Sequence, residues 1–231
     1  MKAQSEPTHA YTQSQKEREP QQPIYLDSAE GFRRLDESDR RSFVTLGMYF
    51  LSQDTQTFCG VASGTMVLNA LVPKNERPPV SEWNPYHLFA QSVFFTPAVE
   101  KIAPRKDVLS NGMTLQQLGE ALSTFPVRVA VSHGSDKCEK DFRKDAMGAL
   151  SGVGCLIVNF LRTSVGQDGG GHFSPIVAYH DKSDSFLMYD VARYKYPPCW
   201  LNTTDLWNAM KTIDSASGKT RGYLLLTKVP S

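Results

Sequence analysis

The chain has 231 residues, of which 40% are hydrophobic and 21% charged, and its formal net charge is +1 at pH 7. This composition is ordinary for a globular protein with a sizeable core. Its scattered basic residues form no arginine-rich arm, so we expect no nucleic-acid partner. No apolar run approaches the ~20 residues that a membrane-spanning helix requires, and the polar start contains no apolar signal segment. We therefore expect no membrane association and a cytoplasmic location, or a periplasmic one if a targeting segment has been removed.

The sequence divides into a polar lead-in and a continuous globular part. Residues 1–24 are rich in Gln, Glu, Ser and Pro, a composition typical of a mobile segment. Over residues 25–231 apolar residues recur without an internal repeat or a linker. This pattern predicts a single domain.

Four segments have the apolar spacing or composition of helices. The first begins at Cys59 and ends before a proline-rich stretch, Thr114 is a suitable N-cap for the third, and Gly152 lies near the end of the fourth. We expect helices over residues 59–71, 84–95, 114–125 and 139–152.

The second half of the chain changes to runs rich in β-branched and aromatic residues, which predict strands. These runs cover residues 127–133, 154–162, 172–180, 185–194 and 221–229. Residues 181–184, with the sequence DKSD, form a turn that joins the third and fourth runs into a hairpin. A helical first half set against an antiparallel sheet in the second half predicts an α+β fold.

One of the four cysteines stands at a reactive position. Cys59 opens a predicted helix, where unpaired backbone N–H groups and the helix dipole favour the thiolate form. Cys155 lies in a predicted buried strand, Cys138 in a half-exposed segment, and Cys199 after two prolines. No CxxC or CxxH pair occurs, so we expect neither a fixed metal site nor a disulfide scaffold.

A base for this thiol is expected at His172, which follows the sequence GQDGGG and opens a predicted strand. Asp190 closes the partner strand, and a turn at residues 181–184 would set position 175 opposite position 190. His172 and Asp190 would then lie roughly 10 Å apart along the strands, near enough for their side chains to meet. The other histidines lie in the lead-in, in an apolar helix, or at strand ends where solvated side chains are typical: His9, His87, His133 and His180.

The order Cys59, His172, Asp190 is typical of a cysteine acyltransferase or peptidase. Gln53, six residues before Cys59, has a side-chain amide that can stabilise the oxyanion of acyl transfer together with the backbone N–H of Cys59. The alternative is a surface Gln53 and a core thiol at Cys59. The combined order of Gln, Cys, His and Asp argues against that alternative.

Six segments resemble the catalytic domain of the phytochelatin synthases, a family of the papain-like cysteine protease clan: QTFCGVASGTMVLNAL, GGGHFSPIVAY, DVARYKYPPCW, DFRKDA, TTDLWNAM and SGKTRGYLLL. The resemblance covers nearly everything after residue 40 and implies a papain-like arrangement of the α+β fold. The Cys-rich C-terminal region of the plant members is not found before Ser231. The chain is therefore more similar to the short cyanobacterial or other bacterial forms.

The resemblance implies that glutathione is the substrate. Cys59 would attack the Cys–Gly peptide bond, release glycine and retain a γ-glutamylcysteinyl thioester, while His172 transfers protons and Asp190 orients the imidazole. A second glutathione, or water, would then accept the acyl group. Cadmium or zinc would act as a thiolate complex of glutathione rather than as a fixed cofactor, with a role in heavy-metal detoxification or glutathione turnover. Short members of the family suggest a homodimer.

The γ-glutamyl end of glutathione carries a carboxylate and an ammonium group, which call for a cation and an anion. The substrate-recognising Asp and Arg of the family resemble Asp214 and Arg221 in TIDSASGKTRG, although an ordinary solvated loop is the alternative. We also expect Arg193, three residues after Asp190, to support the catalytic carboxylate or the substrate pocket.

Two other functions stay open at this point. A C39-like or other papain-clan peptidase shares the order of Gln, Cys, His and Asp, although the segments DVARYKYPP and TTDLWNAM speak against it. A thiol-based heavy-metal-binding protein is disfavoured because four dispersed cysteines make a poor soft-metal site.

Overall fold

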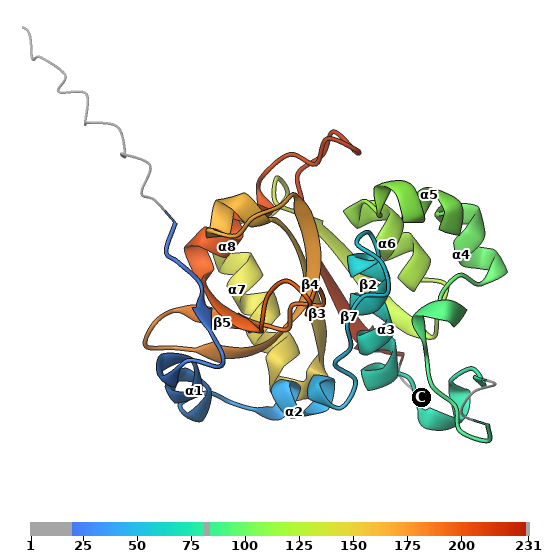
Figure 1. The fold of residues 1–231 in the computed structure, drawn as a ribbon, viewed down its shortest axis with the longest axis horizontal. Helices are drawn as coiled ribbons and strands as arrows, with labels where there is room; N and C mark the ends of the chain where they lie inside the picture. Colours follow the sequence, from blue (N-terminus) through green and yellow to red (C-terminus); the bar gives the residue numbers. More distant parts are fainter. Residues whose placement is uncertain (1–19, 81–83, 230–231) are drawn as a thin grey trace, which may run out of the picture.

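The structure, a computed structural model, describes residues 20–80 and 84–229. Within these ranges a seven-stranded antiparallel sheet lies between two groups of helices (Figure 1). The strand order is β1-β6-β5-β4-β3-β7-β2. The strands are β1 (Ile24–Tyr25), β2 (Val127–His133), β3 (Gly154–Leu161), β4 (Gly171–His180), β5 (Ser185–Met188), β6 (Cys199–Asn202) and β7 (Gly222–Lys228). The predicted α+β class is confirmed.

The helices are divided between the two faces of the sheet because residues of each strand alternate between them. One buried apolar cluster joins a face of the sheet to α3–α6, and a second cluster joins the opposite face to α7 and α8. The helices are α1 (Ala29–Asp36), α2 (Arg41–Gly47), α3 (Cys59–Leu71), α4 (Pro97–Ile102), α5 (Arg105–Asn111), α6 (Leu115–Leu122), α7 (Glu139–Gly148) and α8 (Thr203–Met210). Shorter helical turns are η1 (Lys74–Glu76), η3 (Gln91–Val93), η4 (Ala149–Val153) and η5 (Arg162–Val165).

The helix that begins at Cys59 is the central element of the first cluster. Its predicted bounds are confirmed, and nearly all of its side chains are buried because it is apolar on every side. Ser63 donates a hydrogen bond to the backbone carbonyl of Phe173 at 3.2 Å, which fixes α3 against β4 beside His172. The expected Thr114 N-cap is also confirmed, as part of a capping box with Gln117.

The helix expected over residues 84–95 is not formed, and this prediction is wrong. The segment contains only the short turn η3, and His87 forms an isolated bridge with Pro79. The cause is Asn69 on α3, whose side-chain Nδ2 donates to the carbonyl of Phe89 at 2.8 Å and whose Oδ1 accepts from the N–H of Phe89 at 2.9 Å. These two bonds satisfy the backbone groups that a helix would have used.

The hairpin of β4 and β5 differs from the expected register by one residue. It begins as predicted, with His180 opposite Ser185, but a β-bulge follows, so that Ile176 lies opposite Met188. The strand expected over residues 185–194 therefore ends early, at Met188.

The bulge decides on which face of the sheet Asp190 lies. The expected register would set Asp190 opposite Pro175, on the other face from His172. Continuation of the shifted register sets it opposite Ser174, on the same face as His172. The N–H of Val191 donates to Ser174 Oγ at 3.3 Å, in agreement with this position.

The polar lead-in expected over residues 1–24 falls mostly outside the described residues, which begin at residue 20, and its mobility stays a prediction. Sequence patterns did not indicate β1, β6 or the short helices α1, α2, α4, α5 and α8. Each of these elements is eight residues or shorter, so its periodicity is weak. No helix in the described ranges is both long enough and apolar enough to cross a membrane.

Replacement of Asn69 by Ala should lower the free energy of unfolding by about 2–4 kcal/mol, because both backbone groups of Phe89 would remain buried without partners. The matched control Asn208→Ala changes an exposed amide on α8 and should shift the free energy by less than about 0.5 kcal/mol. Urea denaturation measures both values. Equal stability of the two variants would contradict the role of Asn69.

Candidate active site

His172 and Asp190 are in direct contact near the start of β4. Nε2 of His172 lies 2.8 Å from Oδ1 of Asp190, and Ser174 Oγ lies 3.0 Å from the same nitrogen. Both members of the pair are buried, with exposed fractions of 4% and 0%. Since Nε2 is occupied, Nδ1 is the ring nitrogen left for the thiol of Cys59.

The side chain that supports Asp190 is Arg162, which directly follows β3. Its Nη1 and Nη2 donate to the two carboxylate oxygens at 2.8 and 2.9 Å, and the backbone N–H of Ala192 adds a third bond at 2.9 Å. Sequence reasoning missed Arg162. The available signal was an arginine at the end of an apolar strand, because a cation at such a place is rarely buried without a partner.

Arg193 does not take this supporting position, and that part of the expectation is corrected. Its side chain is exposed, and its guanidinium lies over the ring of Phe50 at 4.7 Å from the centroid. The reason is the turn after Asp190, since the N–H of Lys195 bonds to the carbonyl of Ala192 and directs residue 193 outward. A contact of Arg193 with substrate stays a prediction.

Cys59 lies half-buried at the first position of α3, beside His172. Burial raises the pKa of the Cys59 thiol. The hydrogen bond and charge of His172, together with the backbone N–H groups of Phe173 and Gly60, outweigh burial and lower this pKa below its ordinary value. The thiol is therefore disposed to ionise.

The pKa of the His172 imidazole is raised, and the pKa of the Asp190 carboxyl is lowered. Burial lowers the pKa of His172, but hydrogen bonds and charges from Asp190 and Cys59 outweigh burial and raise it. Burial likewise disfavours the charged form of Asp190, yet His172 and Arg162 hold the pKa of that carboxyl well below its usual range. The three shifts together favour a thiolate–imidazolium pair beside an ionised carboxylate.

Gln53 is buried close to this pair. Its backbone N–H donates to the carbonyl of Val191 at 2.8 Å, and its side-chain Nε2 donates to the carbonyl of Thr55 at 2.7 Å. The amide lines a pocket together with His172, and its Oε1 is buried without a hydrogen-bond partner in the described part of the chain. One N–H of the amide has no protein acceptor among these residues and is available to an oxyanion.

Asp214 and Arg221 line one pocket of about 280 Å³ with Cys59. Nη2 of Arg221 lies 3.7 Å from Oδ1 of Asp214, and both side chains are largely buried. Nε of Arg221 and Oδ1 of Asn159, which also lines the pocket, are buried without partners among the described residues. The pocket thus offers a cation, an anion and an unpaired amide oxygen within one cavity beside the thiol. Asn159 was not identified from sequence because it lies within an apolar strand.

Gly171, next to His172, is required by the close approach of Arg221. A Cβ atom at position 171 would lie 2.1 Å from Nη1 of Arg221, well inside van der Waals contact. The glycine run before His172 therefore lets the guanidinium lie directly against β4.

The remaining thiols and histidines lie apart from this chemistry. Cys155 is buried as expected, and burial raises its pKa to about 12, so this thiol is inert near neutral pH. Cys138 is exposed and Cys199 is buried. His180 is buried rather than solvated, which corrects the expectation, because α1 packs nearby and Oε2 of Glu37 lies 3.1 Å from its Nε2.

Alkylation of Cys59 by iodoacetamide should reach its plateau rate below the pH at which an ordinary thiol ionises, about 8.5. Replacement of Asp190 by Asn should move the inflection of the curve of alkylation rate against pH upward by about one pH unit or more. The reason is that the imidazolium that stabilises the thiolate loses its ionised partner. Mass-resolved alkylation rates measure this, with a Cys59→Ala variant to subtract the other thiols. An unchanged inflection in Asp190→Asn would contradict the coupling.

Comparison with known proteins agrees with the geometry. The model of a family described as phytochelatin synthase matches residues 14–223. Glutathione gamma-glutamylcysteinyltransferase 1 from Lotus japonicus is 35% identical over 81% of this chain and 36% of its own length. The protein of the same name from Triticum aestivum is 36% identical over 89% of this chain and 40% of its own length. Glutathione gamma-glutamylcysteinyltransferase from Schizosaccharomyces pombe is 28% identical over 90% of this chain and 49% of its own length.

The chain thus spans between about a third and a half of the length of these relatives. The match nevertheless includes Gln53, Cys59, His172, Asp190 and Arg221 in a single family domain. The chain belongs to the phytochelatin synthase family.

Proposed function

We propose that the chain is a glutathione γ-glutamylcysteinyltransferase that works through a thioester on Cys59. The observation that carries the proposal is the half-buried thiol at the N-terminus of α3, beside an imidazole that is held by a buried carboxylate. Family membership and the names of the relatives supply the substrate class. The same set of residues, on an antiparallel sheet packed against the cysteine helix, fits a papain-like arrangement.

In the first half-reaction the thiolate of Cys59 attacks the carbonyl carbon of the Cys–Gly bond of glutathione. The carbonyl oxygen becomes an oxyanion, which the backbone N–H of Cys59 and the side-chain amide of Gln53 stabilise. The imidazolium of His172 then gives its proton to the glycine nitrogen. The C–N bond breaks, and glycine leaves as a neutral amine.

In the second half-reaction the neutral imidazole of His172 takes a proton from the acceptor, which is the free amine of another glutathione or a water molecule. The acceptor attacks the thioester carbonyl, the C–S bond breaks, and the thiolate–imidazolium pair forms again. Transfer to glutathione produces phytochelatin, and transfer to water produces γ-glutamylcysteine.

The pocket of Asp214 and Arg221 fits the γ-glutamyl end of the substrate. The guanidinium of Arg221 suits the α-carboxylate, while the carboxylate of Asp214 and the unpaired Oδ1 of Asn159 suit the α-ammonium group. Because the two charges lie close together, the pocket favours a zwitterionic end group over a continuing peptide chain. This feature favours the transferase over the alternative of a peptidase that cleaves after a Gly-Gly leader.

We propose that cadmium or zinc enters as a thiolate complex of the substrate. Within residues 20–80 and 84–229, no three His, Cys, Asp or Glu side chains gather as a metal site. Turnover of S-methylglutathione, whose thiol is blocked covalently, would show whether a masked substrate thiol suffices without metal.

Replacement of Cys59 by Ala should reduce glycine release from glutathione at least about a thousandfold, because the attacking sulfur is lost. Circular dichroism should show an unchanged fold. A Cys138→Ala variant, which removes an exposed thiol, is the matched control and should keep its activity. Retained glycine release in Cys59→Ala would disprove the assignment of the nucleophile.

Replacement of Arg221 by Gln should raise the KM for glutathione about tenfold or more with a smaller effect on kcat, because a contact to the non-reacting end of the substrate is lost. Lys219→Gln removes an exposed cation from the same loop and serves as the control. Steady-state kinetics of glycine release measure both variants. The same KM in the unmodified chain and in both variants would contradict binding of the γ-glutamyl group in this pocket.

A further inference from the structure

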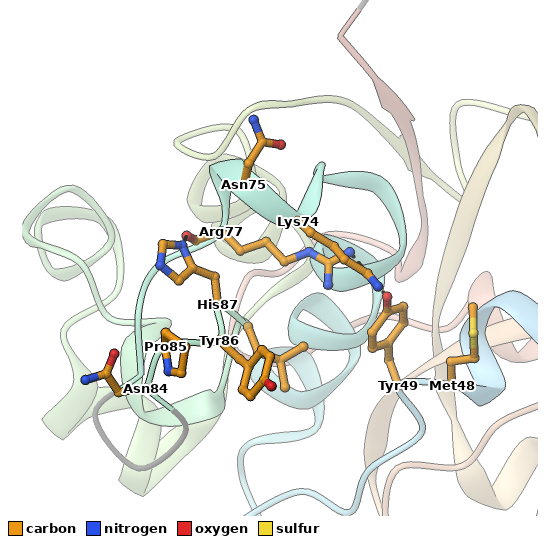
Figure 2. Close-up of a pocket in the computed structure, with 10 residues that line it drawn as sticks. Met48, Tyr49, Lys74, Asn75, Arg77, Asn84, Pro85, Tyr86 and His87 are labelled. Carbon is orange, nitrogen blue, oxygen red and sulfur yellow. Dashed lines mark hydrogen bonds between the residues drawn. The ribbon is translucent and has the colours of Figure 1, made fainter.

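A separate pocket, of about 970 Å³, lies where the segment after α2 meets η1 and residues 84–88 (Figure 2). It shares no residue with the pockets that contain His172 and Cys59. The described residues that line it are Met48, Tyr49, Lys74, Asn75, Arg77, Asn84, Pro85, Tyr86, His87 and Leu88. The proposed acyl-transfer mechanism uses none of them.

The pocket carries positive charge that the described residues do not neutralise. Lys74 and Arg77 line it, and no described lining residue is a carboxylate. Figure 2 shows the side chains of Lys74 and Arg77 extending toward the hydroxyl of Tyr49. Two cations that converge without an anion between them repel each other, and an added anion would relieve that repulsion.

Arg77 is the anchor of this arrangement. Its exposed fraction is 7%, and it forms no ion pair in the described part of the chain. Nε donates to the carbonyl of Val72 at 3.0 Å, and Nη2 donates to the carbonyl of Asn69 and to the hydroxyl of Tyr49. Both N–H groups of Nη1 are left without an acceptor among the described residues.

Capping of α3 accounts for only part of this arrangement. The carbonyls of Asn69 and Val72 belong to the last turn of α3, where a cation is favourable. That role explains why Arg77 is buried. It does not require Lys74 in the same pocket. Among the described residues neither Nη1 nor the hydroxyl proton of Tyr49 has an acceptor, so both are available to a ligand.

Aromatic and apolar side chains form another part of the lining, beside the amides of Asn75 and Asn84. The ring of Tyr49 lies under the guanidinium at 5.2 Å, and Tyr86, which is 76% exposed, faces the pocket beside Pro85. An exposed aromatic side chain next to unpaired cations suits a ligand that combines an oxyanion with a planar body.

We propose that this pocket binds a small organic oxyanion, a phosphate or carboxylate on a planar group, at a site separate from the glutathione site. The oxyanion accepts hydrogen bonds from Nη1 of Arg77, Nζ of Lys74 and the hydroxyl of Tyr49. The planar group lies against Tyr86.

The test is a titration of the ¹⁵N-labelled full chain with inorganic phosphate, adenosine monophosphate and benzoate, followed by NMR. The backbone amides of Tyr49, Lys74 and Tyr86 and the Nε–H of Arg77 should shift and saturate. Adenosine monophosphate should bind more tightly than phosphate, because its planar base lies against Tyr86, and equal affinities for the two would overturn the role given to the planar group. Saturation by benzoate would identify carboxylates as ligands as well, and saturation by the phosphates alone would restrict the site to phosphate.

Charge reversal at the exposed Lys74 separates this site from nonspecific attraction. Lys74→Glu should weaken binding of adenosine monophosphate at least about tenfold, whereas Lys101→Glu, the same change at an exposed lysine on α4, should alter it less than about twofold. The proposal is overturned if no probe gives saturable shifts at these residues, or if Lys74→Glu binds as tightly as the unmodified chain.

Discussion

The buried carboxylate of Asp190 is the group on which the rest of the site depends. A carboxylate at 0% exposure would ordinarily become neutral, because desolvation of a charge is costly. Here Arg162 binds both of its oxygens and Ala192 donates a backbone N–H, so the charge persists. The ionised carboxylate raises the pKa of His172, and the imidazolium in turn lowers the pKa of Cys59. The ionised carboxylate of Asp190 thus determines, through the imidazole of His172, the ionisation of the sulfur of Cys59.

The fold brings these groups together from three neighbouring strands. Arg162 follows β3, His172 lies near the start of β4, and Asp190 follows β5, and these strands are adjacent in the sheet. The register of β3 and β4 sets Phe160 opposite His172, and the two rings meet edge to face. The bulge in β4 then turns Asp190 to the face of His172. One extra residue in a strand is therefore as important for the site as the residue types themselves.

Sequence reasoning was most successful for elements whose structure is determined by residues close together in the sequence. The helix from Cys59 to Leu71 is long and apolar, and the proline-rich stretch after it fixes its end. The proximity of His172 and Asp190 followed from simple hairpin geometry, although the bulge changed the register. Bulges depend on tertiary packing, so a repeating pattern of residues does not show them.

The predictions that failed involve partners distant in the sequence. Asn69 takes the backbone bonds of Phe89, twenty residues later, and this side-chain contact overrides helical spacing. Arg162, after β3, pairs with Asp190, after β5, across the intervening strand β4, whereas the nearer Arg193 turns outward. Sequence proximity was a poor guide to the partner of a buried charge, because adjacent strands bring together residues separated by long segments of chain.

The most direct test of the account is the acylation of Cys59 itself. The protein should be mixed with glutathione, quenched in acid within the first turnover, and analysed by intact-protein and peptide mass spectrometry. The account predicts a mass increase equal to one γ-glutamylcysteinyl group on the peptide that contains Cys59, removable by hydroxylamine. Glycine release with no such adduct on Cys59, or with the adduct on another cysteine, would contradict it.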